Sequence, residues 1–203
     1  MNKWWIGLAT LCACTFAQAD DSNWRLFAAV GMATGGDTII AGTITNTTTN
    51  TVERYDIRAG TGTRYRVGAE YRLLGRFTLQ GSIGRSVSDP MGVNGSLTFT
   101  TTPTELLAFV NLTDGLRVGG GVRQTSAEMT GTGVAARSPV VGTYTSTQGS
   151  VVEFQYLFSA DNSNAGYKKT QVGIAFRLVQ ESFTHNALTF NGDHRELSLV
   201  LYF

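Results

Sequence analysis

Few residues of this chain have the types and the spacing that catalysis requires. The chain has two histidines, His185 and His194, and Glu181 and Ser182 precede the first of them. An acid, a hydroxyl and a base therefore fall within a short polar stretch, as a nucleophilic triad would need. A serine three residues before a histidine is nevertheless a common coincidence, and spacing alone does not set the geometry of a triad. We expect a solvated loop here and predict no catalytic residue.

Metal, cofactor and thiol chemistry have equally little support. Two histidines with scattered carboxylates do not make a convincing metal site. Both cysteines, Cys12 and Cys14, lie near the start of the chain, in a segment that we expect to be removed. The run Gly119–Gly121 has neither the lysine nor the helix that follows a phosphate-binding loop, so we interpret these glycines as relieving crowding within a strand. The sequence thus predicts no metal and no cofactor.

The balance of charge argues against a nucleic-acid partner. Lys and Arg together number 16 and Asp and Glu 15, and loss of Lys3 with the leader would make the two equal. Binding to phosphate backbones needs a clustered basic surplus, which is missing here. With 42% hydrophobic and 15% charged residues, the composition is typical of one folded domain.

The first nineteen residues have the three parts of a secretory signal peptide. A basic start at Lys3 is followed by an apolar run, Trp4–Phe16, and by the A-x-A site Ala17–Ala19. One alternative is a membrane anchor, but the run is too short to span the bilayer as a helix. Another is a lipoprotein, because the segment around Cys14 loosely resembles a lipobox. We predict a cleaved signal peptide over residues 1–19 and a mature domain over residues 20–203.

The mature chain alternates with a period of two residues, which is typical of strands with one apolar face. The longest run extends from Tyr55 to Leu73 and places Arg64, Arg66 and Arg72 together on its polar face. Similar alternation marks eight segments in all: 24–32, 55–73, 77–83, 105–112, 116–123, 152–158, 171–178 and 196–203. An even number of such strands predicts an all-β fold, an eight-stranded antiparallel up-and-down transmembrane β-barrel.

The connections between these segments alternate between short and long. The short ones are Leu74–Arg76, Thr113–Gly115 and Ser159–Gly166. The long ones are Thr34–Arg54, Ser88–Ser96, Ser126–Ser150 and Gln180–His194. In outer-membrane barrels the short turns face the periplasm and the long loops face outward. The threonine-rich first link is either a mobile loop or an extension of the hairpin above the membrane, and the sequence does not choose between them.

The placement of aromatic residues favours a membrane barrel over a soluble one. Six aromatic residues occupy the strand ends beside the short turns: Trp24, Tyr71, Phe77, Phe158, Tyr167 and Phe203. Such a ring suits a bilayer interface, whereas a soluble barrel has no reason to carry outward aromatics at one end. The apolar face is then expected to face lipid and the polar face to line the lumen.

A network of charges is expected in that lumen. Turning the strand arginines toward lipid would cost roughly 2–4 kcal/mol each near the midplane, which sets the register. If a hairpin is centred on Asp114, Glu105 faces Arg123, and Arg117 and Glu153 lie on nearby strands. The predicted luminal charges are Arg64, Arg66, Glu70, Arg72, Glu105, Arg117, Arg123, Glu153, Arg177 and Glu196. We expect Arg54, Arg76, Arg137 and Arg195 to be solvated.

Over residues 20–203 the chain resembles the OmpA/OmpX-like family of small outer-membrane β-barrels. The resemblance rests on the leader, the eight strands, the small-residue segment Ala28–Gly31 and the terminal segment Glu196–Phe203. It implies that Leu199, Leu201 and Phe203 form the signal read by the barrel-insertion machinery. It also implies export to the outer membrane of a Gram-negative bacterium. A periplasmic peptidoglycan-binding domain is not expected.

The expected role is structural or surface-interacting, carried by the four long loops around a plugged polar lumen. The expected partners are outer-membrane lipids and lipopolysaccharide, the insertion machinery, and a host or surface ligand at the loops. One alternative is a narrow low-conductance pore, although the interior of eight strands is just wide enough for side chains to fill. Another is an enzyme acting on lipid A. Family members that deacylate lipid A have a serine two residues from a histidine, whereas Ala187 stands two residues after His185.

Overall fold

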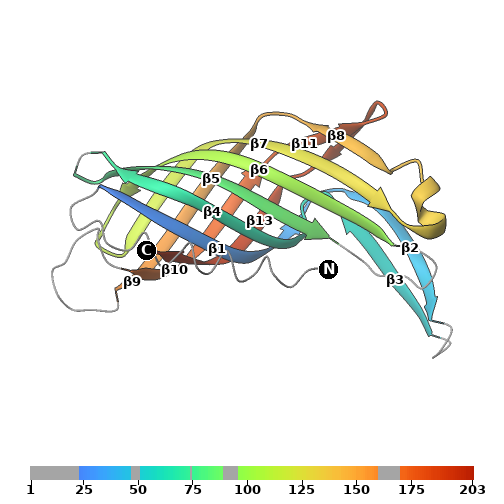
Figure 1. Cartoon of the computed structure of the whole chain (residues 1–203), viewed down its shortest axis with the longest axis horizontal. Helices are drawn as coiled ribbons and strands as arrows, with labels where there is room; N and C mark the ends of the chain where they lie inside the picture. The colour runs from blue at the N-terminus through green and yellow to red at the C-terminus, as the bar shows by residue number, and fades with distance from the viewer. Residues whose placement is uncertain (1–22, 47–50, 74, 89–95, 160–169) are drawn as a thin grey trace, which may run out of the picture.

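Eight strands form a closed antiparallel wall in the computed structural model, which describes residues 23–46, 51–73, 75–88, 96–159 and 170–203 (Figure 1). The wall strands are β1 (Trp24–Gly35), β4 (Gly62–Arg72), β5 (Phe77–Ser88), β6 (Leu97–Asn111), β7 (Leu116–Gly131), β9 (Gly149–Ser159), β10 (Gln171–Gln180) and β13 (His194–Tyr202). Each pairs with the next, and the β1–β13 ladder closes the ring. The predicted eight-stranded barrel is confirmed. The predicted leader lies outside the described residues.

Six further elements gather at one end of the barrel, and we call them together the cap. They are β2 (Thr38–Asn46), β3 (Thr51–Arg58), the 3-10 helix η1 (Gly133–Arg137), β8 (Gly142–Ser146), β11 (Ser182–His185) and β12 (Leu188–Asn191). Figure 1 shows them at the end opposite the C-terminus, with the β2–β3 hairpin reaching beyond the wall. The threonine-rich link therefore forms a hairpin. No helix in the described part of the chain is long and apolar enough to cross a membrane.

The run from Tyr55 to Leu73 is not one strand, so this expectation is wrong. The chain turns between β3 and β4, and at Gly62 φ is +145°, a value that L side chains rarely adopt. Thr61 fastens the turn, because its hydroxyl donates to the carbonyl oxygen of Gly35 at 3.2 Å. The alternation continues through the turn in the sequence, but the apolar residues before the turn point to the interior, whereas those after it point outward. Ile57 and Ala59, expected to face lipid, are buried in the apolar cluster inside the cap.

The outer face of the wall is apolar, as expected from the alternation. Met32 is 74% exposed and Trp24 60% exposed, and exposed valines, leucines and isoleucines of the other strands share this face, whereas others such as Leu107 and Val200 point inward and are buried. The nine residues Trp24–Met32 advance about 26 Å, or about 20 Å in height at a tilt of about 40°, close to the apolar belt of known membrane barrels.

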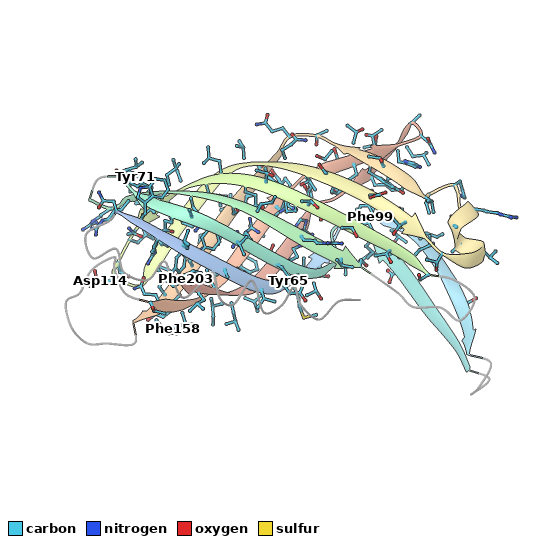
Figure 2. All side chains as sticks on the ribbon, in the orientation of Figure 1. Tyr65, Tyr71, Phe99, Asp114, Phe158 and Phe203 are labelled. Atoms are coloured by element: carbon cyan, nitrogen blue, oxygen red, sulfur yellow. The ribbon has the colours of Figure 1, made fainter. Side chains whose placement is uncertain are left out.

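Aromatic residues collect at the end of the belt that carries the tight turns. Figure 2 shows Tyr71, Phe158 and Phe203 there, near the turn at Asp114. The ring centroids of Trp24 and Tyr71 are 4.9 Å apart, and Phe77 is also exposed. Tyr167 lies outside the described residues. The five described members therefore have the placement that an interface girdle requires.

The glycine run on β7 lets neighbouring strands approach closely. A Cβ at Gly121 would lie 2.0 Å from the carbonyl oxygen of Leu106, and one at Gly119 would lie 2.5 Å from the Phe109 ring. At the outward-facing Gly120 the nearest atom would be 3.5 Å away. The interpretation of these glycines as relieving crowding is confirmed for Gly119 and Gly121.

Candidate functional site

The polar face of the wall encloses a dense set of charges. Among the described residues, six arginines and five glutamates are buried: Arg25, Arg64, Arg66, Arg117, Arg123, Arg177, Glu70, Glu105, Glu153, Glu181 and Glu196. Nine of the ten predicted luminal residues belong to this set. Buried charges of this kind are tolerated when they are paired and hydrogen-bonded.

Glu105 is the centre of the layer of charges nearer the cap. The β6–β7 register places it opposite Arg123, as predicted, and their charged atoms are 2.7 Å apart. Two further guanidinium groups reach it across the lumen, from Arg177 at 2.5 Å and from Arg66 at 3.4 Å. One carboxylate thus connects three strands besides its own.

Arg177 and Arg66 extend this layer to the other side of the lumen. Arg177 also contacts Glu153 at 3.1 Å and Glu196 at 2.9 Å. Arg66 makes two parallel bonds to the oxygens of Glu153, at 2.9 and 3.1 Å, a bidentate geometry that a lysine cannot reproduce. The charges therefore form one cross-braced layer that spans the barrel.

A second layer lies toward the turn end and is centred on Glu70. Its carboxylate accepts from Arg25 at 2.6 Å and from Arg117 at 2.7 Å. Tyr202 completes the layer: its hydroxyl donates to Gln155 at 2.9 Å, and the Arg25 guanidinium lies 4.0 Å from the centre of its ring. Our luminal prediction omitted Arg25 and Tyr202. Their inward phase on alternating strands was the signal that could have identified them.

Arg64 departs from the paired pattern, and Arg72 lies outside the charge layers. Arg64 is buried, yet within the described residues it has no carboxylate partner, and its Nη2 only donates to the carbonyl oxygen of Gly60 at 3.4 Å. Arg72, predicted to be luminal, instead donates to the carbonyl oxygen of Gly75 at 3.0 and 3.2 Å. It is the last residue of β4, so its side chain reaches the turn instead of the lumen. Its inclusion in the luminal network is corrected.

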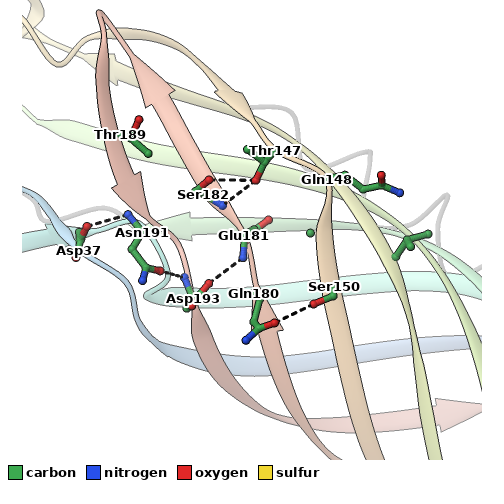
Figure 3. Close-up of a pocket in the computed structure, with 12 residues that line it drawn as sticks. Asp37, Thr147, Gln148, Ser150, Gln180, Glu181, Ser182, Thr189, Asn191 and Asp193 are labelled. Atoms are coloured by element: carbon green, nitrogen blue, oxygen red, sulfur yellow. Dashed lines mark hydrogen bonds between the residues drawn. The ribbon is translucent and has the colours of Figure 1, made fainter.

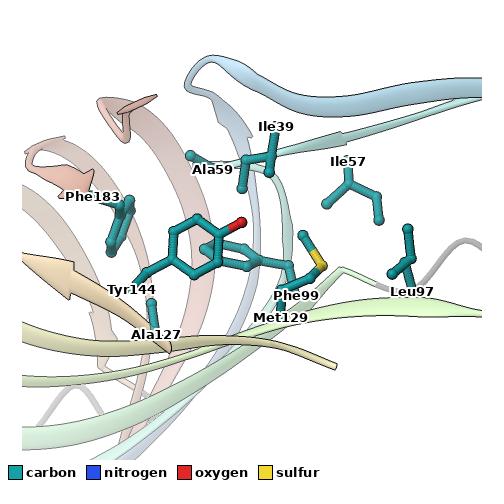
Figure 4. Packing of buried hydrophobic residues seen from close by; sticks show 9 residues of the cluster. All are labelled: Ile39, Ile57, Ala59, Leu97, Phe99, Ala127, Met129, Tyr144 and Phe183. Atoms are coloured by element: carbon teal, nitrogen blue, oxygen red, sulfur yellow. The ribbon is translucent and has the colours of Figure 1, made fainter. Parts of the chain in front are cut away.

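Above the charges, an apolar cluster fills the inside of the cap (Figure 4). Its buried members are Ile39, Ile57, Ala59, Leu97, Phe99, Ala127, Met129, Tyr144 and Phe183. The Phe99 ring meets Tyr144 and Phe183 edge-on, with centroids 5.4 and 5.8 Å away. Tyr144 donates its hydroxyl to the carbonyl oxygen of Val140 at 2.8 Å, and burial raises the pKa of Tyr144 to about 12. No pattern in the sequence predicted that these residues meet.

The three residues that could have formed a triad have separate partners. Glu181 is buried and pairs with Arg123 at 2.9 Å. The Ser182 hydroxyl is 3.1 Å from that of Thr147. His185 stacks on Tyr144 and places its two ring nitrogens 2.9 and 3.2 Å from the carbonyl oxygens of Thr143 and Pro139. Each of these side chains therefore makes a structural contact, Glu181 within the luminal charge network and Ser182 and His185 within the cap.

An open groove of about 760 Å³ lies where the cap meets the wall (Figure 3). Two of its acidic groups are engaged with backbone, since Asp37 accepts from the Asn191 N–H at 2.8 Å and Asp193 accepts from the Glu181 N–H at 3.0 Å, and the third, Glu181, pairs with Arg123. Gln180 and Ser150 bond to each other at 3.2 Å. No group of three or more metal-binding side chains occurs among the residues that the structure describes.

The sequence matches no model of a known protein family and no curated protein. Solved structures are similar in fold. Neisserial surface protein A (NspA) superposes with a TM-score of 0.54 at 11% identity, covering 89% of this chain and 96% of that one. Ail, the attachment invasion locus protein of Yersinia pestis, solved with the heparin analogue sucrose octasulfate, gives 0.50 at 9% identity, covering 89% and 99%. The chain has the fold of the small eight-stranded outer-membrane β-barrels.

Proposed function

We propose that this chain is an integral outer-membrane protein with a closed lumen that acts through its cap at the cell surface, without enzymatic activity. The observation that carries the proposal is the double closure of the barrel. The charge layers around Glu105 and Glu70 cross the lumen, and the apolar cluster covers them on the cap side. An exposed apolar belt on the outside and a filled interior suit a protein that is anchored in a membrane and makes its contacts through the cap at one end of the barrel.

The double closure also argues against the pore alternative. A conducting path would have to pass between fully buried side chains such as Arg117, Arg123 and Arg177, each bound to carboxylates from other strands. It would then have to cross a packed cluster with no charged member. Eight-stranded barrels have no spare interior width to compensate for this.

Two exposed apolar tips support a surface-interaction role. Val134 on η1 is 79% exposed, and Leu188 at the β11–β12 turn is 61% exposed. Among the described residues, the other exposed large apolar side chains belong to the wall strands and their short turns. The two tips belong to segments that are tied together by His185, which contacts Pro139. Contiguous exposed apolar patches mark contact sites for other proteins, and we propose that these two tips together form one.

The charge of the cap does not favour a polyanion as partner. Ail was solved with a heparin analogue. In this chain, Arg58 on the cap is 3.4 Å from Asp56, and the remaining described charges of the cap and its loops are of both signs, such as the cationic Arg137 and the anionic Asp37. We therefore propose a protein surface as the cap's partner.

Membrane insertion and topology are tested together on intact cells. Trypsin added outside should cleave after Arg137, which is exposed on the cap, and should spare Arg76, which is exposed at a tight turn. In planar bilayers the purified barrel should show little or no steady conductance. Cleavage at Arg76 would invert the topology, and a large steady conductance would favour the pore.

The surface role is tested with cells that carry the barrel and a panel of immobilised extracellular-matrix proteins. The double variant Val134→Ser/Leu188→Ser should lose binding shown by the wild type while its surface level stays unchanged. Arg137→Gln is the matched control, since it alters the same rim without removing an apolar tip. Equal binding by wild type and the double variant would reject the tips as the contact site. Stronger binding to sucrose octasulfate beads would point to a polyanion.

A further inference from the structure

The apolar belt ends at the same step on every wall strand. On each of the eight strands, the last strongly exposed apolar residue on the cap side is followed, two positions closer to the cap, by an exposed polar residue, and only on β5 does a further, half-buried apolar residue of that phase, Val87, follow it. These first polar residues are Thr34, Thr63, Arg85, Thr104, Gln124, Ser150, Gln180 and Arg195. The ring they form marks the level at which lipid tails give way to headgroups.

Only two members of this ring are charged, and both are arginines. Arg85 follows Ile83 on β5, and Arg195 follows Leu197 when β13 is read toward the cap. The remaining six members are threonine, serine or glutamine. The strand order β13–β1–β4–β5 places both arginines on one half of the wall, with the hydroxyls of Thr34 and Thr63 on the two strands between them.

Neither guanidinium is neutralised by a residue that the structure describes. Among the described residues, Arg85 and Arg195 form no ion pair and no side-chain hydrogen bond, unlike the arginines of the lumen. Next to Arg195 on β13, Glu196 faces the lumen and pairs with Arg177, and Asp193, just before β13, accepts the backbone N–H of Glu181. Across the sheet, Arg195 faces Thr34 on β1 and Leu178 on β10, and Arg85 faces Tyr65 on β4.

We propose that Arg85 and Arg195 bind phosphate groups on the headgroup of lipopolysaccharide in the outer leaflet. A guanidinium at the edge of the apolar belt meets headgroups directly, and its planar fork matches phosphate oxygens in a bidentate geometry. The two arginines are three strand spacings apart, at least about 14 Å, so each takes its own phosphate. The inference rests on the proposed location in the outer membrane and defines one lipid-binding half of the wall.

The opposite half of the wall offers a contrast within the same molecule. There the ring carries the neutral side chains Gln124, Ser150 and Gln180, and the last two bond to each other beside the groove. Hydrogen-bonding groups without charge have no comparable preference for a phosphate. An anionic headgroup should therefore settle on the β13–β1–β4–β5 half alone.

The test uses the full barrel folded in uncharged detergent micelles and titrated with purified lipopolysaccharide. The wild type should gain thermal stability and bind saturably. The double variant Arg85→Gln/Arg195→Gln should bind about tenfold or more weakly, because two charge-assisted contacts are lost. Gln180→Ala, on the opposite half of the same ring, and Arg76→Gln, at the turn end, are controls that should bind as the wild type does.

Two further arms identify the ligand chemistry. Lipopolysaccharide stripped of its phosphates should bind the wild type as weakly as the intact lipid binds the double variant. Inorganic phosphate alone should not stabilise the protein. Equal affinity of the double variant and the wild type, or of the stripped and intact lipid, would overturn the proposal. Stabilisation by inorganic phosphate alone would show an ion site and would overturn it as well.

Failure of this inference is separable from failure of the proposed function. Heat-shifted mobility on a denaturing gel reports folding of each variant, and insertion into vesicles reports membrane integration. A wild type that does not insert would reject the outer-membrane proposal. A wild type that inserts but shows no preference for phosphate would reject the arginine site alone.

Discussion

At the scale of single residues, the barrel depends on carboxylates that each serve several guanidinium groups. Glu105 contacts Arg123, Arg177 and Arg66, and no other described residue could take over all three. Arginine suits this arrangement because its fork can address two partners at once, as Arg177 does between Glu153 and Glu196.

Removing Glu105 should therefore be costly. Glu105→Ala leaves buried guanidinium groups without their shared partner, and we expect a loss of about 3–5 kcal/mol in the free energy of unfolding, measured with urea in micelles. The double change Glu105→Ala/Arg123→Ala should lose less than the sum of the two single losses, without regaining wild-type stability, because Arg177 and Arg66 remain. Losses that simply add would show that the facing pair does not interact.

Arg64 and Arg66 form a matched pair two positions apart on β4. Arg66 makes two parallel bonds to the carboxylate of Glu153, whereas Arg64 has a carbonyl oxygen as its one described partner. Arg66→Met should destabilise the barrel by several kcal/mol, while Arg64→Met should leave it unchanged or stabilise it, since an uncompensated buried charge is removed. Equal losses in urea unfolding would show that Arg64 has a partner of similar value.

The cap should respond to high pH through Tyr144. Burial raises the pKa of Tyr144 to about 12, above the value of about 10 for an unfolded tyrosine. The neutral phenol is therefore favoured in the fold, and its contribution is full below about pH 10 and lost as the pH rises toward 12. Compared with the wild type, Tyr144→Phe should show a smaller fall in unfolding free energy over this window. Parallel curves for the two proteins would contradict the assignment.

At the scale of elements, the wall could be predicted and the cap could not. Period-two alternation fixes both the presence of a strand and the face it buries, so the register that sets Glu105 against Arg123 followed from the turn at Asp114. Contacts across the lumen, such as Arg177 with Glu105, depend on how the ring closes, which no local pattern encodes. In the cap, the same alternation predicted wrongly that Ile57 faces lipid. Ile57 is buried, because the chain turns between β3 and β4 and the apolar face before the turn points inward.

The glycine run of β7 offers a paired test of strand packing. Gly121→Ala places a Cβ against the carbonyl oxygen of Leu106 and should cost about 1–3 kcal/mol through strain. Gly120→Ala, one residue away, faces outward with ordinary contact distances and should be nearly neutral. Urea unfolding of the two variants measures the difference. A larger loss for Gly120→Ala would show that the outward face carries the constraint.

At the scale of the whole molecule, closure depends on the seam between the first and last strands. Phe203 extends this seam by two backbone bonds, from its N–H to the carbonyl oxygen of Leu26 at 3.0 Å and from the Leu26 N–H back to its own oxygen at 2.9 Å. Its ring lies at the aromatic end of the belt (Figure 2). The terminal residue therefore contributes both to the ladder and to the interface.

Deleting Phe203 should lower the amount of barrel in the membrane while leaving export to the periplasm intact. Phe203→Ala, which keeps the backbone bonds and removes the ring, separates the two contributions. Membrane fractions resolved by heat-shifted mobility give the readout. Normal membrane levels of the deletion variant would remove this role from the terminus.

The filled interior also dictates a sequence of events. A closed barrel with a filled lumen has no passage for the cap. The β2–β3 hairpin and the η1 and β11–β12 segments could therefore not pass through the lumen after closure. If the barrel is inserted with its cap outward, as we propose, we expect the cap to cross the bilayer while the sheet is still open and β1 to pair with β13 last. Ala28 and Leu201 face each other across the β1–β13 seam. A disulfide engineered between these two positions and formed before insertion should close the barrel too early and leave the cap on the periplasmic side.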